Sequence, residues 1–364
     1  MLQFLLSAYL FVAETINGAE IKTFYLCYVK KKLVLFCFSI IVFFLVWNWQ
    51  IVVYGFQQAI GQFSMMSRTI SVADMIKDSL VADSIKTKLR WVAEIKQFAQ
   101  DSLGLAATEN YTAYYEQNGD PILWIVTACP PYSMEEFQWA YPVLGELGYK
   151  GYFRKELADI EADKLSKEGY DVDVGVVNAW STLGWLQDPV LSSMMKMTEG
   201  ELARLLIHEL THTTFYIPDS ANFNENLATF IGDKGAQKYM KEKYGIGSKQ
   251  LVNYQNHLSD LKKLATHFLG GSKQLSKLYN KLEGLNAKQK RKLKDQQIKL
   301  IMANLDTVNF SSESKFVHIR SNSFMPNNTF FNSYQMYRGE QQELDSVFIN
   351  KCNGYFPMFV NSWK

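Results

Sequence analysis

The chain has 364 residues, 48% hydrophobic and 20% charged, enough for one large folded domain or two smaller ones. This composition excludes a disordered or low-complexity protein. Lysine and arginine total 38 against 36 acidic residues, and a net charge of +2 is too small for nucleic acid to be the main partner. None of the four cysteines lies at a metal-ligand spacing, which excludes a thiolate zinc site, and whether Cys129 and Cys352 pair stays open.

Residues 33–55 form an apolar run without Asp, Glu, Lys, Arg or His. As a helix this run would be about 34 Å long, more than the roughly 30 Å hydrocarbon core of a bilayer. Trp47, Trp49 and Tyr54 lie near its C-terminal end, where aromatic residues collect at a membrane interface. The run predicts a transmembrane helix over residues 33–55 that contacts the lipid bilayer. A buried core helix and the apolar part of a cleaved signal peptide are the alternatives.

Three lysines, Lys30, Lys31 and Lys32, directly precede the apolar run. Because the cytoplasmic flanks of membrane helices are enriched in Lys and Arg, we expect residues 1–32 to form a cytoplasmic segment and residues 56–364 to be exported. Whether residues 1–32 belong to the native start of the protein stays open.

The exported part shows both helix and strand patterns. Residues 57–103 are predicted to be largely helical. Strands are predicted at Ile122–Ala128 and Tyr170–Val177, with an amphipathic helix at Arg154–Glu168 between them and no phosphate-binding glycine loop. From Glu199 almost to residue 310 the pattern is helical. We therefore expect one α+β domain with a small sheet and a mostly helical C-terminal part.

Residues 208–212 read HELTH, a match to the HExxH pattern in a chain with only five histidines. On a helix, His208 and His212 lie one turn apart on the same face, so both imidazoles can bind one cation. Glu209 lies about 100° further round, where it can contact a metal-bound water without being a ligand. The pattern predicts two metal ligands and a general base, and two polar histidines on an exposed face are the alternative.

The helix that carries this motif is expected over about residues 199–217. Thr198 and Glu201 have the spacing of a capping box, and Pro218 ends the helix. Leu202, Leu206 and Leu210 lie on the face opposite His208 and are expected to pack on the core.

A third protein ligand is needed to leave one coordination position open for water. Glu225 is the favoured residue, although Asn222 and Glu225 also fit a helix-capping pair, and Asp219 and Asp233 are the alternatives. Two imidazoles and one carboxylate predict one Zn²⁺ per chain, which would lower the pKa of a bound water towards about 7 and polarise a substrate carbonyl. Glu209 would take the proton of the attacking water and pass it to the leaving amine. The expected reaction is hydrolysis of an acyl bond, with a peptide as the substrate.

At this point the chain resembles a family, the bacterial predicted aminopeptidases, a zinc metallopeptidase group with an N-terminal membrane or lipid anchor. The resemblance is carried by YGFQQAIGQ (54–62), YKGYF (149–153), STLGWLQDPVL (181–191), LIHELTH (206–212), FNENLATF (223–230) and NNTFFNSYQMY (327–337). The HExxH motif followed by an Asn-Glu segment is similar to that of the gluzincins, in which the glutamate is the third zinc ligand. The resemblance therefore implies a zincin-like domain and supports Glu225 over the two aspartates.

The resemblance also implies roles on the substrate side of the site. Asn327 and Asn328 match residues suggested to bind substrate, and Tyr337 is the residue chosen to stabilise the oxyanion. STLGW precedes the metal helix as a substrate-binding edge strand does in many such peptidases, so Gly184 and Trp185 are expected to line the cleft.

Two features depart from the family pattern. Neither Cys27 nor Cys37 follows the small residues of a lipobox, so a spanning anchor is expected in place of a lipid. The gap between His212 and Glu225 is shorter than in well-studied gluzincins. The chain is expected to be a single-pass protein of the bacterial inner membrane, with its N-terminus cytoplasmic and its catalytic domain periplasmic.

The leading hypothesis is a membrane-anchored zinc peptidase, acting as an aminopeptidase on peptide or protein substrates. An aminopeptidase must also bind the free ammonium of its substrate, and the candidate carboxylates are Glu135, Glu136, Asp188 and Glu201. The alternatives are a non-catalytic envelope protein that uses a zincin fold for binding or assembly, and a zinc amidase acting on cell-wall material. The natural substrate, exo- or endopeptidase action and the oligomeric state stay open.

Overall fold

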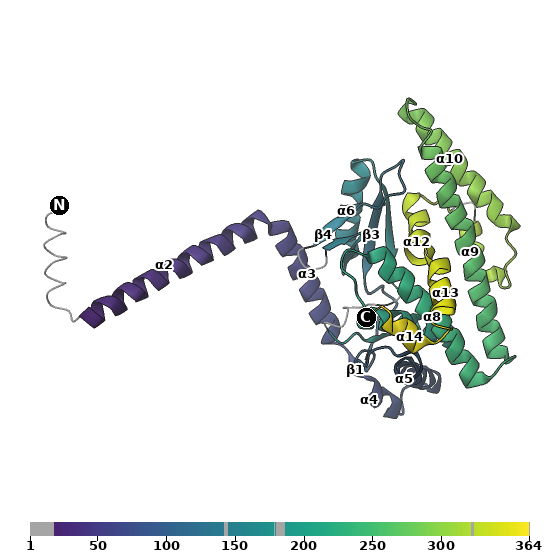
Figure 1. The fold of residues 1–364 in the computed structure, drawn as a ribbon, viewed down its shortest axis with the longest axis horizontal. Coiled ribbons are helices and arrows are strands. Elements are labelled where there is room, and N and C mark those ends of the chain that lie inside the picture. The colour runs from purple at the N-terminus through teal and green to yellow at the C-terminus, as the bar shows by residue number, and fades with distance from the viewer. Residues whose placement is uncertain (1–17, 142–144, 178, 180–185, 322–323, 364) are drawn as a thin grey trace. The chain divides into compact units, whose positions relative to one another are not determined.

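The computed structural model describes residues 18–141, 145–177, 179, 186–321 and 324–363 (Figure 1). The chain divides into two compact units, Met1–Gln62 and Phe63–Lys364. All the residues discussed below as a functional site belong to the second unit.

The predicted transmembrane helix over residues 33–55 is wrong. The apolar run is shared between helix α2 (Gly18–Trp47) and helix α3 (Trp49–Met66), and the chain turns between them at Asn48. Among the described residues, no helix combines the length and the apolar character needed to cross a membrane. This finding overturns the expected bilayer contact through residues 33–55 and the expected single-pass location in the bacterial inner membrane.

The helix predicted over residues 57–103 is interrupted. After α3 the chain forms a short strand, β1 (Ile70–Ser71), and helices α4 (Val72–Lys77) and α5 (Asp83–Leu103). Helix α5 ends at Gly104, whose φ of 77° is a left-handed conformation that glycine adopts without strain.

Three antiparallel strands form the main sheet, in the order β6-β3-β7. The predicted strands are found as β3 (Trp124–Cys129) and β7 (Asp171–Val176), and β6 (Tyr149–Tyr152) pairs with the other edge of β3. The predicted helix between them is α6 (Lys155–Lys167), which packs against β3 and β7 (Figure 1). Two smaller sheets complete the β structure: β1-β2-β8, with β2 (Ala113–Tyr115) and β8 (Val190–Leu191), and the hairpin β4 (Trp139–Tyr141) with β5 (Gly145–Leu147).

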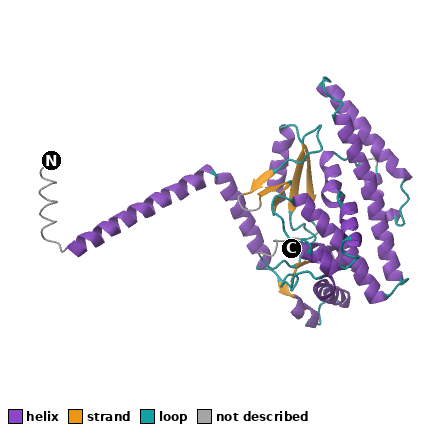
Figure 2. Ribbon diagram, viewed as in Figure 1, coloured by secondary structure: helices purple, strands orange, loops and turns teal. Residues whose placement is uncertain are grey.

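The rest of the unit is almost entirely helical, so the fold is a mostly helical α+β arrangement (Figure 2). The elements are η1 (Ser192–Lys196), α7 (Glu199–Thr214), α8 (Ala221–Tyr244), α9 (Lys249–Tyr279), α10 (Ala287–Asn304), η2 (Leu305–Thr307), η3 (Glu313–Lys315), α11 (Val317–Arg320), α12 (Asn328–Arg338), α13 (Gln341–Asn350) and α14 (Phe356–Asn361).

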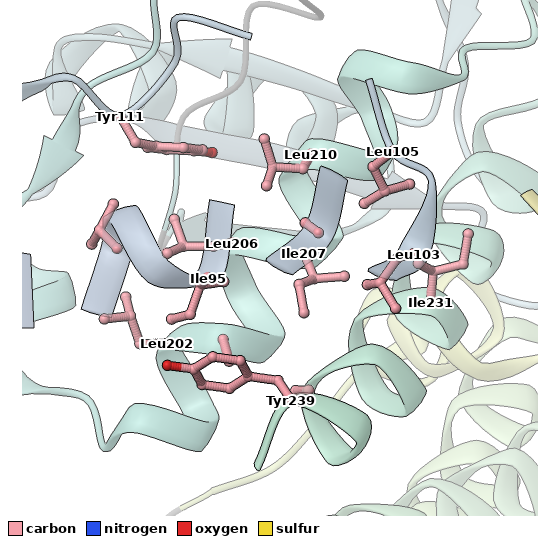
Figure 3. Packing of buried hydrophobic residues seen from close by; sticks show 14 of the residues in the cluster. Ile95, Leu103, Leu105, Tyr111, Leu202, Leu206, Ile207, Leu210, Ile231 and Tyr239 are labelled. Atoms are coloured by element: carbon pink, nitrogen blue, oxygen red, sulfur yellow. The ribbon is translucent and has the colours of Figure 1, made fainter. Parts of the chain in front are cut away.

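The main hydrophobic core lies around helix α7. Its apolar face, with Leu202, Leu206 and Leu210, is buried together with Ile95 of α5 and Ile231 of α8 (Figure 3). Burial of each such side chain contributes roughly 1.5–3 kcal/mol. Because this face is held by the core, the histidines on the other side of α7 have a fixed direction.

A second core cluster fixes helix α12. Phe331 of α12 is fully buried with Phe268 of α9 and Ile301 of α10, and the rings of Phe268 and Phe331 meet edge to face at 5.9 Å. Edge-to-face packing of this kind is favourable for aromatic pairs. The C-terminal end of α12 is thereby held beside α8, against which it packs.

Candidate metal centre

Helix α7 begins as the sequence predicts. The hydroxyl of Thr198 accepts a hydrogen bond from the backbone N–H of Glu201, and the Glu201 carboxylate accepts one from the backbone N–H of Thr198 at 2.9 Å. This capping box satisfies two backbone donors that have no partner inside the helix. The helix ends at Thr214, slightly before the predicted end at residue 217, because the backbone is already extended at Phe215.

Helix α8 packs closely against α7 at Gly232. A Cβ atom at this position would lie 2.8 Å from the backbone oxygen of Arg204 and 3.3 Å from Cβ of His208. Only glycine fits this contact without displacement of the backbone. The close approach sets the position of Glu225, which lies in the first turns of α8, relative to the two histidines of α7.

His208, His212 and Glu225 converge at one point between the two helices. Their ligand atoms all lie within 4.8 Å of one another. Oε2 of Glu225 is 3.2 Å from Nε2 of His208 and 3.5 Å from Nε2 of His212, and the two Nε2 atoms are 3.2 Å apart. Two imidazoles and a carboxylate are the donor set of catalytic zinc sites, which keep one position open. The residues present therefore fit a zinc ion.

The electrostatics of this cluster favour positive charge within it. Burial alone would lower the pKa of His212, but the carboxylate of Glu225 outweighs burial and raises that pKa to about 9. The pKa of Glu225 is held far below its usual value because the two histidines outweigh the effect of burial. A site that favours positive charge in this way fits a metal cation, whose binding would release the proton from His212.

A hydroxyl on α8 faces the other nitrogen of one histidine. Oγ1 of Thr229 lies 3.5 Å from Nδ1 of His208. Partners at the second ring nitrogen orient histidine ligands in metal sites. This contact leaves Nε2 of His208 directed towards Glu225.

Glu209 follows His208 on α7 and faces the same cluster. Burial raises the pKa of its carboxyl, and the charge of Glu225 raises it further, while His208 and His212 oppose the shift. A raised pKa makes the carboxylate a stronger base than an exposed glutamate, which favours a role as general base.

Tyr337 lies beside the cluster, near the end of α12. Its ring centroid is 6.3 Å from that of His208, and the residue as a whole is 38% exposed. The negative charge of Glu225 and then burial raise the pKa of Tyr337 well above its usual value, with smaller contributions from Tyr149, Glu209 and others. The phenol therefore stays protonated and can donate a hydrogen bond.

The C-terminal end of α12 is held by contacts with α8. Near its C-terminal end, Arg338 forms an ion pair with Asp233 of α8, and Asp233 also binds Arg204 of α7 at 2.6 Å. The Asn226 amide of α8 donates a hydrogen bond to the backbone oxygen of Met336 at 2.7 Å. These contacts join α7, α8 and α12 and set the position of Tyr337 relative to the histidines.

Comparison with known families identifies the family of the chain. The sequence model of the family described as putative aminopeptidase matches residues 53–364. The chain belongs to this family. No curated protein matches the chain significantly, and neither does any solved structure. The predicted resemblance is confirmed at the level of the family, and the gluzincin type stays a prediction.

Asn327 and Asn328, which were predicted to bind substrate, lie at the start of α12 and hydrogen-bond to other parts of the chain. Asn328 is fully buried, and its amide donates to the backbone oxygens of Pro130 and Ser133 while accepting from the hydroxyl of Tyr279. Asn327 is the N-cap of α12. The structure places both residues where they anchor α12. Gly184 and Trp185 lie outside the described residues.

The two alternative ligands are held away from the cluster. Asp219 accepts a hydrogen bond from the backbone N–H of Glu146 at 3.1 Å, and Asp233 is bound by Arg204 and Arg338. Among the described residues, Glu225 is the carboxylate that joins the two histidines.

Tyr111 is a residue near the site that the sequence did not indicate. It is 2% exposed, has a positive φ of 64°, and its hydroxyl has no hydrogen-bond partner within the described part of the chain. Burial raises its pKa well above the usual value, and the charges of Glu209 and Asp188 add to the shift. No periodic pattern marks a tyrosine in a loop, and with 20 tyrosines in the chain composition could not select it.

Proposed function

We propose that the chain is a zinc-dependent aminopeptidase that hydrolyses peptide bonds in peptides or proteins. Membership of the putative aminopeptidase family suggests a peptidase. The observation that carries the zinc proposal is the convergence of His208, His212 and Glu225, whose ligand atoms lie within 4.8 Å of one another. These three residues would hold one zinc ion. The chemistry that such an ion supplies is Lewis acidity, which polarises a carbonyl and acidifies water.

In this proposal, Glu209 moves the proton. Its carboxylate accepts the proton of the attacking water while the water oxygen forms the new bond to the carbonyl carbon. When the carbon–nitrogen bond breaks, the same proton passes to the leaving amine. The raised pKa of Glu209 suits this double role, because a strongly acidic carboxyl group would accept the proton too weakly.

Tyr337 is proposed to stabilise the negative charge that develops on the carbonyl oxygen. Its phenol is held beside His208 by α12 and stays protonated, as its raised pKa requires. A hydrogen bond aimed at the developing oxyanion typically changes kcat by about 10²- to 10³-fold.

The proposal is tested by metal content and turnover in parallel. Purified wild-type protein and the Glu225→Ala variant are incubated with zinc and dialysed to remove the excess. The metal that stays bound is measured by inductively coupled plasma mass spectrometry. We expect one zinc per chain in the wild type and a large loss in Glu225→Ala. Glu209→Gln is the matched variant, because it should keep zinc while losing turnover by about 10²- to 10⁴-fold. Equal zinc in Glu225→Ala and wild type would contradict the ligand assignment.

A further inference from the structure

A third carboxylate, that of Glu136, acts on Tyr337 in addition to those of Glu225 and Glu209, and has no role in the proposal so far. Glu136 lies between β3 and β4, and its side chain is partly buried. The carboxylate packs directly over Gly148, where a Cβ atom would lie 2.3 Å from Oε2 of Glu136. A side chain at position 148 would therefore displace this carboxylate, so the glycine leaves room for it.

Glu136 has no cationic partner. Among the residues that the structure describes, no Lys, Arg or His forms an ion pair with it, and the hydrogen bond recorded for its side chain is with Gln138. Burial raises the pKa of Glu136 to about 7. A carboxylate removed from water is costly unless a positive charge compensates it, and none of the described residues supplies one to Glu136.

Tyr337 connects Glu136 to the metal centre. Its phenol lies in the electrostatic field of three carboxylates, those of Glu225, Glu209 and Glu136, and of the neighbouring Tyr149. Tyr149 follows Gly148 directly, at the start of β6. Glu136 therefore acts electrostatically on the proposed oxyanion donor, as the proposed third ligand and the proposed general base also do.

The other three carboxylates considered from the sequence are occupied or exposed. Glu201 caps α7 and forms an ion pair with Lys315 at 2.6 Å. Asp188 is 1% exposed and accepts a hydrogen bond from the amide of Asn110 at 2.9 Å. Glu135 is exposed to solvent. Among these candidates, Glu136 alone combines burial, the absence of a described cation and proximity to Tyr337.

We propose that Glu136 binds the free α-ammonium group of the substrate's N-terminal residue, and so makes the site select peptides with an unblocked N-terminus. In such a substrate only one Cα separates the ammonium nitrogen from the carbonyl of the first peptide bond, so an anion beside the metal centre positions that bond for attack. The inference rests on the proposed peptidase function and deepens it. A charge-assisted hydrogen bond between ammonium and carboxylate is about twice as strong as a neutral one.

The test compares a tripeptide, Leu-Gly-Gly, with its Nα-acetyl form as substrates of the zinc-loaded full chain. For the wild type, kcat/KM should favour the free amine by roughly 30- to 4,000-fold, the range expected for loss of one partner of a buried charge pair. Glu136→Gln should remove most of this preference, whereas Glu135→Gln, the exposed neighbour, should retain it. Glu136→Asp keeps the charge and should retain part of the preference. Because the preference is a ratio within one protein, a partial loss of folded material cancels.

A binding measurement separates this inference from the reaction itself. In the Glu209→Gln background, calorimetric titration with Leu-Gly-Gly should show tighter binding than with the acetylated peptide, and adding Glu136→Gln should abolish the difference. Wild-type cleavage with an unchanged preference in Glu136→Gln would overturn the inference and leave the peptidase function standing. Absence of zinc-dependent cleavage of any peptide by the wild type, together with equal binding of both peptides, would overturn both.

Discussion

The close contact between α7 and α8 predicts that Gly232→Ala weakens both folding and metal binding. The added methyl group would lie 2.8 Å from the backbone oxygen of Arg204, which cannot turn away as the end of a flexible side chain can. Overpacking of this kind costs about 1–3 kcal/mol, and the better helix propensity of alanine offsets up to about 1 kcal/mol. With the full offset, we therefore expect a net loss of up to about 2 kcal/mol in the free energy of unfolding.

The matched control is Gly270→Ala in the interior of α9. A Cβ atom at Gly270 would have no atom within 4 Å, so only the propensity gain remains. This variant should be stabilised by up to about 1 kcal/mol. The two substitutions are chemically identical and should change stability in opposite directions.

The assay is urea unfolding of the zinc-free proteins, followed by zinc titration. Gly232→Ala should also bind zinc more weakly, because displacement of α8 moves Glu225 away from His208 and His212. Stabilisation of Gly232→Ala to the same extent as Gly270→Ala would refute the close packing that sets the position of the third ligand.

Three further substitutions test the surroundings of the site. Tyr111→Phe removes a buried hydroxyl that has no hydrogen-bond partner among the described residues. The free energy of unfolding should stay unchanged or rise by about 1 kcal/mol. A clear fall in the midpoint temperature of thermal unfolding would contradict this. Arg338→Met removes one of the two cations of Asp233 while Arg204 keeps its own bond to it, so the free energy of unfolding should fall by about 1.5–3 kcal/mol. Arg338→Lys should lose less, and an unchanged midpoint in urea unfolding would contradict this. The pKa of Glu201 is lowered from 4.5 to about 2, because bonds from Lys315 and Thr198 outweigh burial, so its stabilisation is complete above about pH 4.5 and is lost as pH falls towards 2. Glu201→Gln should therefore lose less stability than the wild type between pH 5 and pH 3, and parallel acid curves would refute this.

The helix that carries the HExxH motif could be predicted from local sequence because its signals are local. The capping box at Thr198 and Glu201 and the apolar face of Leu202, Leu206 and Leu210 are encoded within one segment, and the structure has both. The strands β3 and β7 were predictable for the same reason, since β3 has contiguous β-branched residues and β7 alternates valine with polar residues or glycine.

The apolar run near the N-terminus shows where hydropathy misleads. The hydropathy of residues 33–55 does not show where a helix ends. The turn at Asn48 was therefore not predicted, and it divides the apolar run between α2 and α3. Helix α3 in turn extends beyond the run to Met66, and a short strand follows it where a continuous helix was expected.

The surroundings of the site could not be predicted because they depend on long-range packing. Tyr111 approaches Glu209 from a loop, and Glu136 is set apart from three other carboxylates by its packing over Gly148, its lack of a described cation and its effect on Tyr337. The role of Asn328 is also clear only in three dimensions, where its amide joins α12 to the loop after β3. Each of these features depends on neighbours far away in the chain.

The measurement that tests the central claim most directly is mass spectrometry of a mixed peptide pool incubated with the purified full chain and zinc, with Glu209→Gln in parallel. The account predicts stepwise loss of single N-terminal residues by the wild type, at least about 10²-fold slower cleavage by Glu209→Gln, and equal zinc content in both proteins. Equal cleavage by the two proteins, or no cleavage by a wild type that has bound zinc, would contradict it.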